Sequence, residues 1–133
     1  MSGVFRGCSS LVDISGIRDW VTSAVAYMDD MFSGCAGLTD LSPLSGWDTS
    51  HAIWMGGMFE GCAGLTSLSP LSSWDTSQVS NMKGMFSGCT GLADATALES
   101  WNVSRVPNPT GVFDVSLPNE ARPTWAKIYV AMA

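Results

Sequence analysis

Charged side chains are scarce in this sequence, and basic ones are the scarcest. Lys and Arg together number 6 and Asp and Glu number 12 in 133 residues, so the net charge is −6 and charged residues make up 14% of the chain. A typical soluble domain has about 25% charged residues. Binding to a phosphate backbone needs a dense stripe of Lys and Arg, so we expect no nucleic acid partner. The 46% of hydrophobic residues excludes an acidic disordered chain.

Long apolar runs are missing as well. No segment approaches the roughly 18 consecutive apolar residues of a membrane-spanning helix, so we expect no membrane span. The first residues, Met1 to Arg6, have neither the basic start nor the apolar stretch of a signal peptide. The sequence therefore indicates no signal peptide in this chain.

Groups for catalysis are also few. His51 is the single histidine, and no residues are spaced around it as in a Ser–His–Asp triad or a zinc site. No glycine motif of the phosphate-binding type occurs. We therefore expect no enzymatic activity, no cofactor and no metal.

What dominates the sequence is an internal repeat of 27 residues. The register holds without insertion or deletion over several residue types. The repeated positions are Phe5, Phe32, Phe59, Phe86 and Phe113; Cys8, Cys35, Cys62 and Cys89; and Trp20, Trp47, Trp74 and Trp101.

Within one repeat, apolar residues recur at steps of three and four, which predicts one face of a helix of about three turns. In the third copy these residues are Val79, Met82, Met85, Phe86 and Cys89. The segment 75–77 (Asp-Thr-Ser) before them is typical of a helix N-cap. The segment 38–44 is short and broken by a proline, so it predicts a short strand and a turn.

A single unit of this kind cannot bury its apolar face, so the copies must stack. We therefore predict an α/β fold, a leucine-rich-repeat solenoid of strand–turn–helix units with parallel strands on one side and helices on the other. Residues 1–113 form this solenoid, with three full and two partial copies, and residues 114–133 form a C-terminal cap. The first layer, with Val4, Phe5 and Leu11, has no comparable cap, so either it self-associates or more chain once preceded it.

Two strings carry a resemblance to a known family. Residues 31–39 read Met-Phe-Ser-Gly-Cys-Ala-Gly-Leu-Thr, and residues 74–79 read Trp-Asp-Thr-Ser-Gln-Val. They resemble the BspA-like leucine-rich repeats of bacterial surface proteins. The resemblance implies a leucine-rich-repeat solenoid, an extracellular or cell-surface location, and a role in adhesion or host contact. It supplies no catalytic residues.

Cysteines and aspartates admit two interpretations each. The four cysteines occupy one repeated position without a CxxC pair, which favours buried free thiols over disulfides. Two rows of acidic residues also follow the repeat, one containing Asp48 and Asp75 and the other Asp13, Asp40 and Asp94. Stacked carboxylates could hold a cation such as calcium, although such residues more often cap turns through bonds to their own backbone.

The positions between the repeated apolar residues change from copy to copy. An outward face that drifts freely normally becomes polar, yet here it carries Tyr27, Ile53 and Trp54, and exposed aromatic residues are typical of binding hot spots. Tyr27 and Trp54 lie one repeat apart, so stacking should make them neighbours. The residues that we single out for partner binding are Tyr27, Asp29, Asp30, His51, Ile53, Trp54, Gln78, Asn81 and Lys83.

Two functional hypotheses follow. The first is a non-enzymatic recognition module that binds a protein partner, either a host or a bacterial surface protein, through this exposed helix face. The second is a structural spacer, one slice of a longer bacterial cell-surface adhesin stalk, which would associate end to end through the open N-terminal layer.

Overall fold

The computed structural model describes residues 1–128, and its regular elements in that range are seven short 3-10 helices. No α-helix and no extended strand occurs in the described part of the chain. The seven helices are η1 (Ser15–Ile17), η2 (Ser42–Leu44), η3 (Ser69–Leu71), η4 (Thr96–Leu98), η5 (Pro109–Val112), η6 (Asn119–Ala121) and η7 (Thr124–Ala126).

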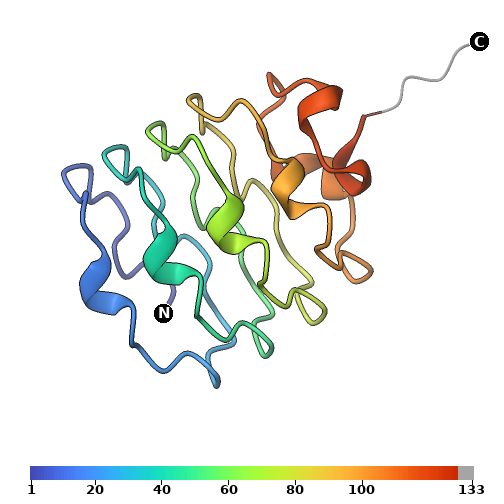
Figure 1. Ribbon diagram of the computed structural model, residues 1–133. Coiled ribbons are helices and arrows are strands. Elements are labelled where there is room, and N and C mark those ends of the chain that lie inside the picture. The colour runs from blue at the N-terminus through green and yellow to red at the C-terminus, as the bar shows by residue number, and fades with distance from the viewer. Residues whose placement is uncertain (129–133) are drawn as a thin grey trace, which may run out of the picture.

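The chain winds into a stack in which each repeat makes one coil. We number the coils by the repeat, with coil 1 at residues 1–27, coil 2 at 28–54, coil 3 at 55–81 and coil 4 at 82–108. Successive coils lie side by side from the N-terminal end to the C-terminal segment (Figure 1). The rings of Phe32, Phe59 and Phe86 are fully buried and stack with centroids 5.5 Å apart. Residues one repeat apart are therefore spatial neighbours.

The predicted helix is wrong, although its apolar face was identified correctly. Val79, Met82, Met85, Phe86 and Cys89 are all buried, but the segment that carries them is a series of turns. Packed α-helices need about 8–10 Å between their axes, whereas the phenylalanine rings of neighbouring coils are 5.5 Å apart. A stack this tight has no room for one α-helix per coil.

The predicted strand at residues 38–44 is also wrong. Helix η2 occupies the end of this segment, and Pro43 lies inside that helix. Proline is compatible with the first turn of a helix because no intrahelical partner is needed for its missing N–H. The α/β fold class is therefore incorrect: neither α-helices nor strands occur in residues 1–128.

Backbone hydrogen bonds between coils replace the expected sheet. The N–H of Phe32 donates to the Met58 carbonyl at 2.8 Å, and the N–H of Phe59 donates to the Met85 carbonyl at 2.9 Å. The residues on each side of such a donor bond within their own coil: next to Phe59, the Met58 N–H donates to the Met55 carbonyl at 3.2 Å and the Glu60 N–H to the Gly57 carbonyl at 3.1 Å. The backbone thus alternates between bonds to the next coil and tight turns, which a continuous helix cannot do.

Glycine is required at one row of this stack. Gly34, Gly61 and Gly88 adopt left-handed φ angles of 78°, 74° and 73°, which residues with a Cβ rarely adopt. A Cβ added at Gly88 would also lie 3.3 Å from the Cα of Gly61. Glycine therefore lets neighbouring backbones approach and interrupts any helix in each coil.

Side chains complete the bonds between coils. The indole Nε1 of Trp74 donates to the Leu44 carbonyl at 2.9 Å, the Sγ of Cys62 to the Phe32 carbonyl at 3.1 Å, and the Oγ1 of Thr49 to the Asp75 carbonyl at 3.0 Å. The same bonds recur one repeat away for Trp101, Cys89 and Thr76. These residue types therefore repeat because each one ties two coils together.

The last coil is closed by residues beyond Phe113. The ring of Trp125 lies 6.3 Å from Trp101 and 5.7 Å from Phe113, measured between centroids. Arg122 is 1% exposed and donates to four backbone carbonyls, those of Thr110, Asp114, Leu117 and Ala126, at 2.8–3.0 Å. The proposed cap boundary at residue 114 stays a prediction, and residues 129–133 of that cap lie outside the described residues.

Candidate functional site

Two aromatic side chains form an exposed pair on the surface of the stack. Tyr27 is 48% and Trp54 is 46% exposed, and their ring centroids lie 4.7 Å apart at an interplanar angle of 52°. Ile53 beside Trp54 is 38% exposed. Isolated apolar residues are ordinary on protein surfaces, whereas the rings of Tyr27 and Trp54 are exposed and in contact with each other.

Backbone bridges hold this pair in place. Tyr27 and Trp54 form a parallel bridge, and Trp54 forms a second one with Asn81. The three residues occupy the same position in coils 1, 2 and 3, so we call them the surface row. The residues that follow Tyr27, Trp54 and Asn81 along the chain, Met28, Met55 and Met82, are fully buried, so the row is anchored to the core on that side.

Carboxylates flank the surface row. Asp29, Asp30 and Glu60 line a depression of about 340 Å³, together with Trp54 and Lys83. A glycine makes this arrangement possible, because a Cβ at Gly57 would collide with the Asp30 carboxylate and lie 3.1 Å from a Glu60 oxygen. The three acidic groups and one lysine give the depression a net negative charge.

Two of these carboxylates have polar neighbours from coil 1. Ser2 Oγ donates to Asp29 Oδ1 at 2.6 Å, and the Arg6 guanidinium lies 4.0 Å from Asp30 Oδ2. The Arg6 side chain is 69% exposed, so solvent screens this ion pair strongly. Asp30 therefore remains available to a positively charged partner.

The structure brings together most of the residues singled out from the sequence. Tyr27, Asp29, Asp30, Trp54, Asn81 and Lys83 belong to the surface row or to the acidic depression, and Ile53 lies beside them along the chain. His51 and Gln78 are exposed but do not line that depression. The imidazole Nδ1 of His51 lies 3.3 Å from Ser50 Oγ.

Sequence reasoning missed Glu60. It lies in the Phe-Glu-Gly-Cys string of coil 3, where coils 2 and 4 carry Ser33 and Ser87. This substitution of an acid for a serine was visible as variation between copies. Its proximity to Asp30 was not visible, because it depends on how coils 2 and 3 pack.

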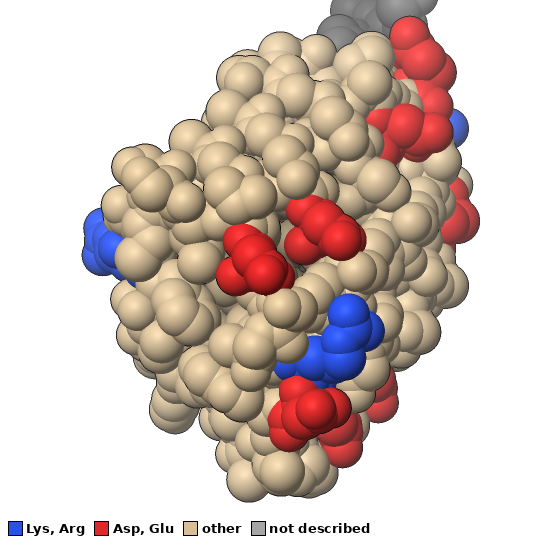
Figure 2. All heavy atoms as spheres, turned by 60° about the vertical axis from the view of Figure 1, so that its left-hand side comes forward, with Lys and Arg blue, Asp and Glu red and all other residues tan. Residues whose placement is uncertain are grey.

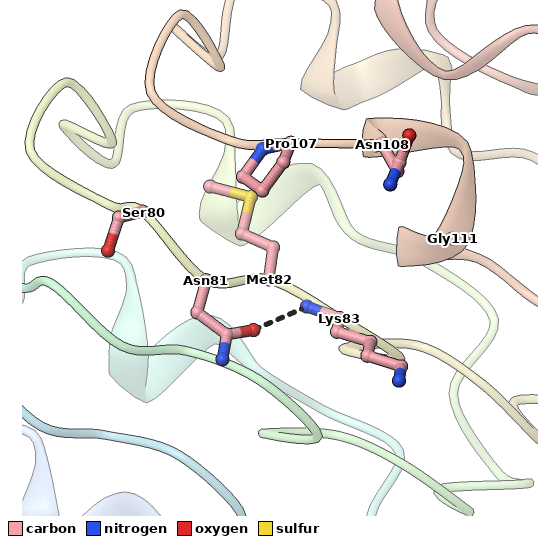
Figure 3. A pocket seen from close by; sticks show the side chains of 7 residues that line it. All are labelled: Ser80, Asn81, Met82, Lys83, Pro107, Asn108 and Gly111. Atoms are coloured by element: carbon pink, nitrogen blue, oxygen red, sulfur yellow. Dashed lines mark hydrogen bonds between the residues drawn. The ribbon is translucent and has the colours of Figure 1, made fainter.

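A second depression of about 390 Å³ lies beside Asn81, the last residue of the surface row (Figure 3). It is lined by residues of coils 3 and 4, namely Ser80, Asn81, Met82, Lys83, Pro107 and Asn108, and by Gly111. Asn81 and Lys83 line both depressions, so the two adjoin.

Comparison with known proteins places the chain in a family. Residues 1–125 match the model of a family described as "Mycoplasma protein of unknown function, DUF285". The chain belongs to DUF285. A search of curated proteins and a search of solved structures each returned no match.

The DUF285 match bears on the resemblance drawn from the sequence motifs. It covers the stacked coils and continues past Phe113 as far as Trp125, so the family model also includes Arg122. It does not single out the BspA-like leucine-rich type. The part of this DUF285 chain that the structure describes has no helix long and apolar enough to cross a membrane.

The acidic rows of this DUF285 chain serve as turn caps. Asp48 Oδ1 accepts bonds from the backbone N–H and the hydroxyl of Ser50, at 3.0 and 2.6 Å. These bonds hold the pKa of the Asp48 carboxyl below its ordinary value, and Asp75 shows the same effect with Ser77. Within residues 1–128 no group of three or more His, Cys, Asp or Glu side chains is arranged to hold a metal ion.

All four cysteines are free thiols, as the repeat pattern predicted, but they differ in exposure. Cys35, Cys62 and Cys89 are buried, whereas Cys8 is exposed in coil 1. Burial is the main cause that raises the pKa of Cys62 and Cys89 to about 12. The three buried thiols are therefore poor nucleophiles.

Charge on the N-terminal face is sparse. In Figure 2 the end of the stack that carries coil 1 comes forward, and Lys and Arg side chains appear there only at isolated places. Asp and Glu side chains lie between and beside these basic groups, and uncharged surface covers the rest of the view.

Proposed function

We propose that this DUF285 chain is a non-enzymatic recognition module that holds a protein partner on the surface formed by Tyr27, Ile53 and Trp54. The observation that carries the proposal is the half-exposed pair of Tyr27 and Trp54 rings, 4.7 Å apart, on a backbone fixed by bridges. A rigid aromatic pair offers a large contact area at little cost in side-chain entropy.

The charges around the pair define the partner further. Asp29, Asp30 and Glu60 border Trp54 on one side. A partner with an apolar patch and an adjacent Lys or Arg would satisfy both features, and the opposite charges would speed association. The proposed partner is therefore a protein with a basic rim around an apolar centre.

A surface location fits this role and is part of the proposal. The motifs Met31–Thr39 and Trp74–Val79 resemble those of BspA-like repeats in bacterial surface proteins, which implies an extracellular or cell-surface setting with adhesion or host contact. On this basis the partner is a host or bacterial surface protein.

Paired affinity measurements test the proposal. The wild-type chain and the variant Tyr27→Ser/Trp54→Ser are immobilised side by side, exposed to bacterial and host cell-surface extracts, and each captured protein is purified and titrated. The double variant should bind the captured partner at least about tenfold more weakly, since hot-spot aromatics contribute about 2 kcal/mol or more each.

The matched control is Val21→Ser, which removes an apolar side chain that is 87% exposed and lies outside the surface row. It should leave the affinity unchanged, and both variants should keep the thermal midpoint of the wild type. Equal affinity of the double variant and the wild type would refute the proposal, as would failure of the wild type to capture any protein specifically.

The second candidate is the structural spacer. One observation favours it: in coil 1 the outer sides of Phe5 and Trp20 remain partly exposed, with Trp20 at 40%, although both rings stack on coil 2. A spacer would associate through this layer, so light scattering should show a concentration-dependent mass increase that Phe5→Ser abolishes. A constant monomer mass up to about millimolar concentration excludes this candidate.

A further inference from the structure

The bridges of the surface row follow a fixed pattern of two backbone hydrogen bonds. Asn81 donates its N–H to the Ile53 carbonyl at 3.4 Å, to which the Ser80 N–H also donates at 2.9 Å, and the Asn81 carbonyl accepts from the Met55 N–H at 2.8 Å. Trp54 makes the same two bonds with Ala26 and Met28, at 3.2 and 2.9 Å. Trp54 and Asn81 therefore each bond to the two residues that flank the equivalent position one repeat earlier, to the carbonyl of the first and the N–H of the second.

The next pair of bonds in this series is not made. The pattern calls for Asn108 to bond with the Ser80 carbonyl and the Met82 N–H, yet neither group has a hydrogen-bond partner anywhere in residues 1–128. We call this unfilled position the vacant rung. Asn108 is turned away, with a left-handed φ of 52°, and its carbonyl instead accepts from Gly111 N–H at 3.1 Å.

The sequence accounts for the vacancy. Pro107 stands one repeat after Ser80, and proline has no N–H to donate to the Ser80 carbonyl. Pro109 begins η5 one residue after Asn108, so the chain leaves the row at this point. The 390 Å³ depression lies between the two diverging segments (Figure 3).

The two unpaired groups determine what can fill the vacant rung. Met82 is fully buried as a residue, and a buried N–H without an acceptor is costly. One unpaired group is a donor and the other an acceptor, so a bare cation or anion could satisfy only one of them. A residue in extended conformation satisfies both, as Asn81 does for Ile53 and Met55.

We propose that the vacant rung binds an extended peptide segment of a partner protein, in parallel register, through the Ser80 carbonyl and the Met82 N–H. This is strand addition to an open ladder edge, in which main-chain bonds supply affinity and neighbouring side chains supply preference. The site is distinct from the Tyr27–Trp54 pair and does not depend on it.

The chain itself supplies the probe. Residues 78–84, Gln-Val-Ser-Asn-Met-Lys-Gly, lie against residues 53–57 in the position that the peptide would take against residues 80–84. A capped heptapeptide of this sequence is titrated into the ¹⁵N-labelled 133-residue chain while the amide resonance of Met82 is followed. The expected result is a saturable shift of that resonance and slower hydrogen exchange of the Met82 amide.

The control peptide carries N-methyl groups on both its serine and its asparagine, which removes both donors to the Ser80 carbonyl, since Ser80 N–H and Asn81 N–H both donate to the Ile53 carbonyl in the pattern that the peptide copies. It should bind roughly tenfold or more weakly, because that carbonyl is left unpaired. The protein variant Tyr27→Ser/Trp54→Ser should bind the unmodified peptide like the wild type. The experiment thereby distinguishes a failure of the proposed partner binding at Tyr27 and Trp54 from a failure of the proposed peptide binding at the vacant rung.

Three results would overturn the proposal. One is no shift of the Met82 amide at several millimolar peptide, and another is equal binding of the methylated peptide. The third is a Met82 amide that is already protected in the free protein and loses protection when residues 129–133 are deleted, which would mean that the chain's own C-terminal segment fills the rung.

Discussion

At the scale of single residues, the repeat is explained by side chains that donate to carbonyls of neighbouring coils. Trp and Cys donate to the coil before them, as Trp74 and Cys62 do, and Thr donates to the coil after it, as Thr49 does. In a sheet this bonding would come from the backbone alone. Here the backbone turns too tightly to supply every bond, so side chains at fixed positions supply the rest.

Replacing Thr49 with valine tests this function of the side chain. Thr49 is 1% exposed and its hydroxyl is the hydrogen-bond donor to the Asp75 carbonyl. Valine keeps the shape but leaves that carbonyl unpaired, so Thr49→Val should lower the free energy of unfolding by about 1–3 kcal/mol. Urea denaturation measures the change.

The matched control for that variant is Thr39→Val, at an exposed threonine. It should change stability by no more than about 0.5 kcal/mol. Equal effects at positions 39 and 49 would show that the hydroxyl bond between coils contributes nothing.

Thiol labelling tests the burial of the cysteine row. At pH 8 the native protein should react with iodoacetamide rapidly at Cys8 only, because Cys35, Cys62 and Cys89 are buried. The folded pKa of Cys62 and Cys89, about 12, is above their ordinary value of 9.0. Their contribution to stability is therefore complete below pH 9 and is lost as the pH rises from 9 toward 12.

Mass spectrometry of chymotryptic peptides, which separate Cys35 from Cys62, locates the label, and the urea-unfolded chain serves as the reference in which all four thiols react. Rapid labelling of Cys62 in the native protein would contradict the tight stacking of coils 2 and 3.

At the scale of elements, the first N–H of each of the four repeated 3-10 helices, η1 to η4, is bonded by the side chain two positions before it. Asp40 Oδ1 accepts the N–H of Ser42, the first residue of η2, and Asp94 does so for Thr96 of η4, both at 2.8 Å. In front of η3 the equivalent residue is Ser67, whose hydroxyl is 3.3 Å from the Ser69 nitrogen. A shorter, charge-assisted bond is stronger.

Ser67→Asp should therefore stabilise η3 and raise the thermal midpoint at pH 7 by about 1–2 °C. Hydrogen bonds to Ser42 and Thr96 lower the folded pKa of Asp40 and Asp94 below the ordinary value of 3.8. By the same mechanism, the increase in thermal midpoint caused by Ser67→Asp should be complete above pH 3.8 and should disappear as the pH falls below that value.

Ser67→Asn is the control, because asparagine accepts the same bond without a charge. Its effect should not change between pH 7 and pH 3. Calorimetry at both pH values measures the thermal midpoints of the two variants. A thermal midpoint of Ser67→Asp that is still raised at pH 3 would disprove the charge-assisted mechanism.

At the scale of the whole molecule, the stack needs an end that closes it. Arg122 closes the C-terminal end by donating to four backbone carbonyls from a buried position, with Phe113 under its guanidinium at 5.9 Å. A buried planar cation with several donors can satisfy carbonyls that point in different directions. No single backbone segment could do the same.

Arg122→Met should therefore cost about 3–5 kcal/mol, since it leaves several buried carbonyls without partners. Arg122→Lys should recover only part of the loss, because its ammonium cannot reach all four. The control is Arg105→Met at an exposed arginine, which should be nearly neutral. Denaturation of the three variants checks this, and a cost below about 1 kcal/mol for Arg122→Met would refute the closing function.

The sequence by itself determined the spacing of the stack, the buried positions and the neighbours across coils. The fixed step of 27 residues placed Tyr27 beside Trp54 and marked Met82 and Phe86 as core. These features follow from periodicity, because equal spacing puts equivalent side chains in equivalent environments. The binding role of the surface row stays a prediction.

Only the tertiary structure decided the local conformation and the vacant rung. Apolar residues at steps of three and four fit a helix, but they also fit tight turns whose alternate N–H groups bond to the next coil. The choice depends on bonds such as Phe59 N–H to the Met85 carbonyl, between residues 26 positions apart. Pro107 was visible in the sequence, yet its consequence, a Ser80 carbonyl with no partner among residues 1–128, emerged only when the coils were in contact, because nonlocal hydrogen bonds leave no local pattern.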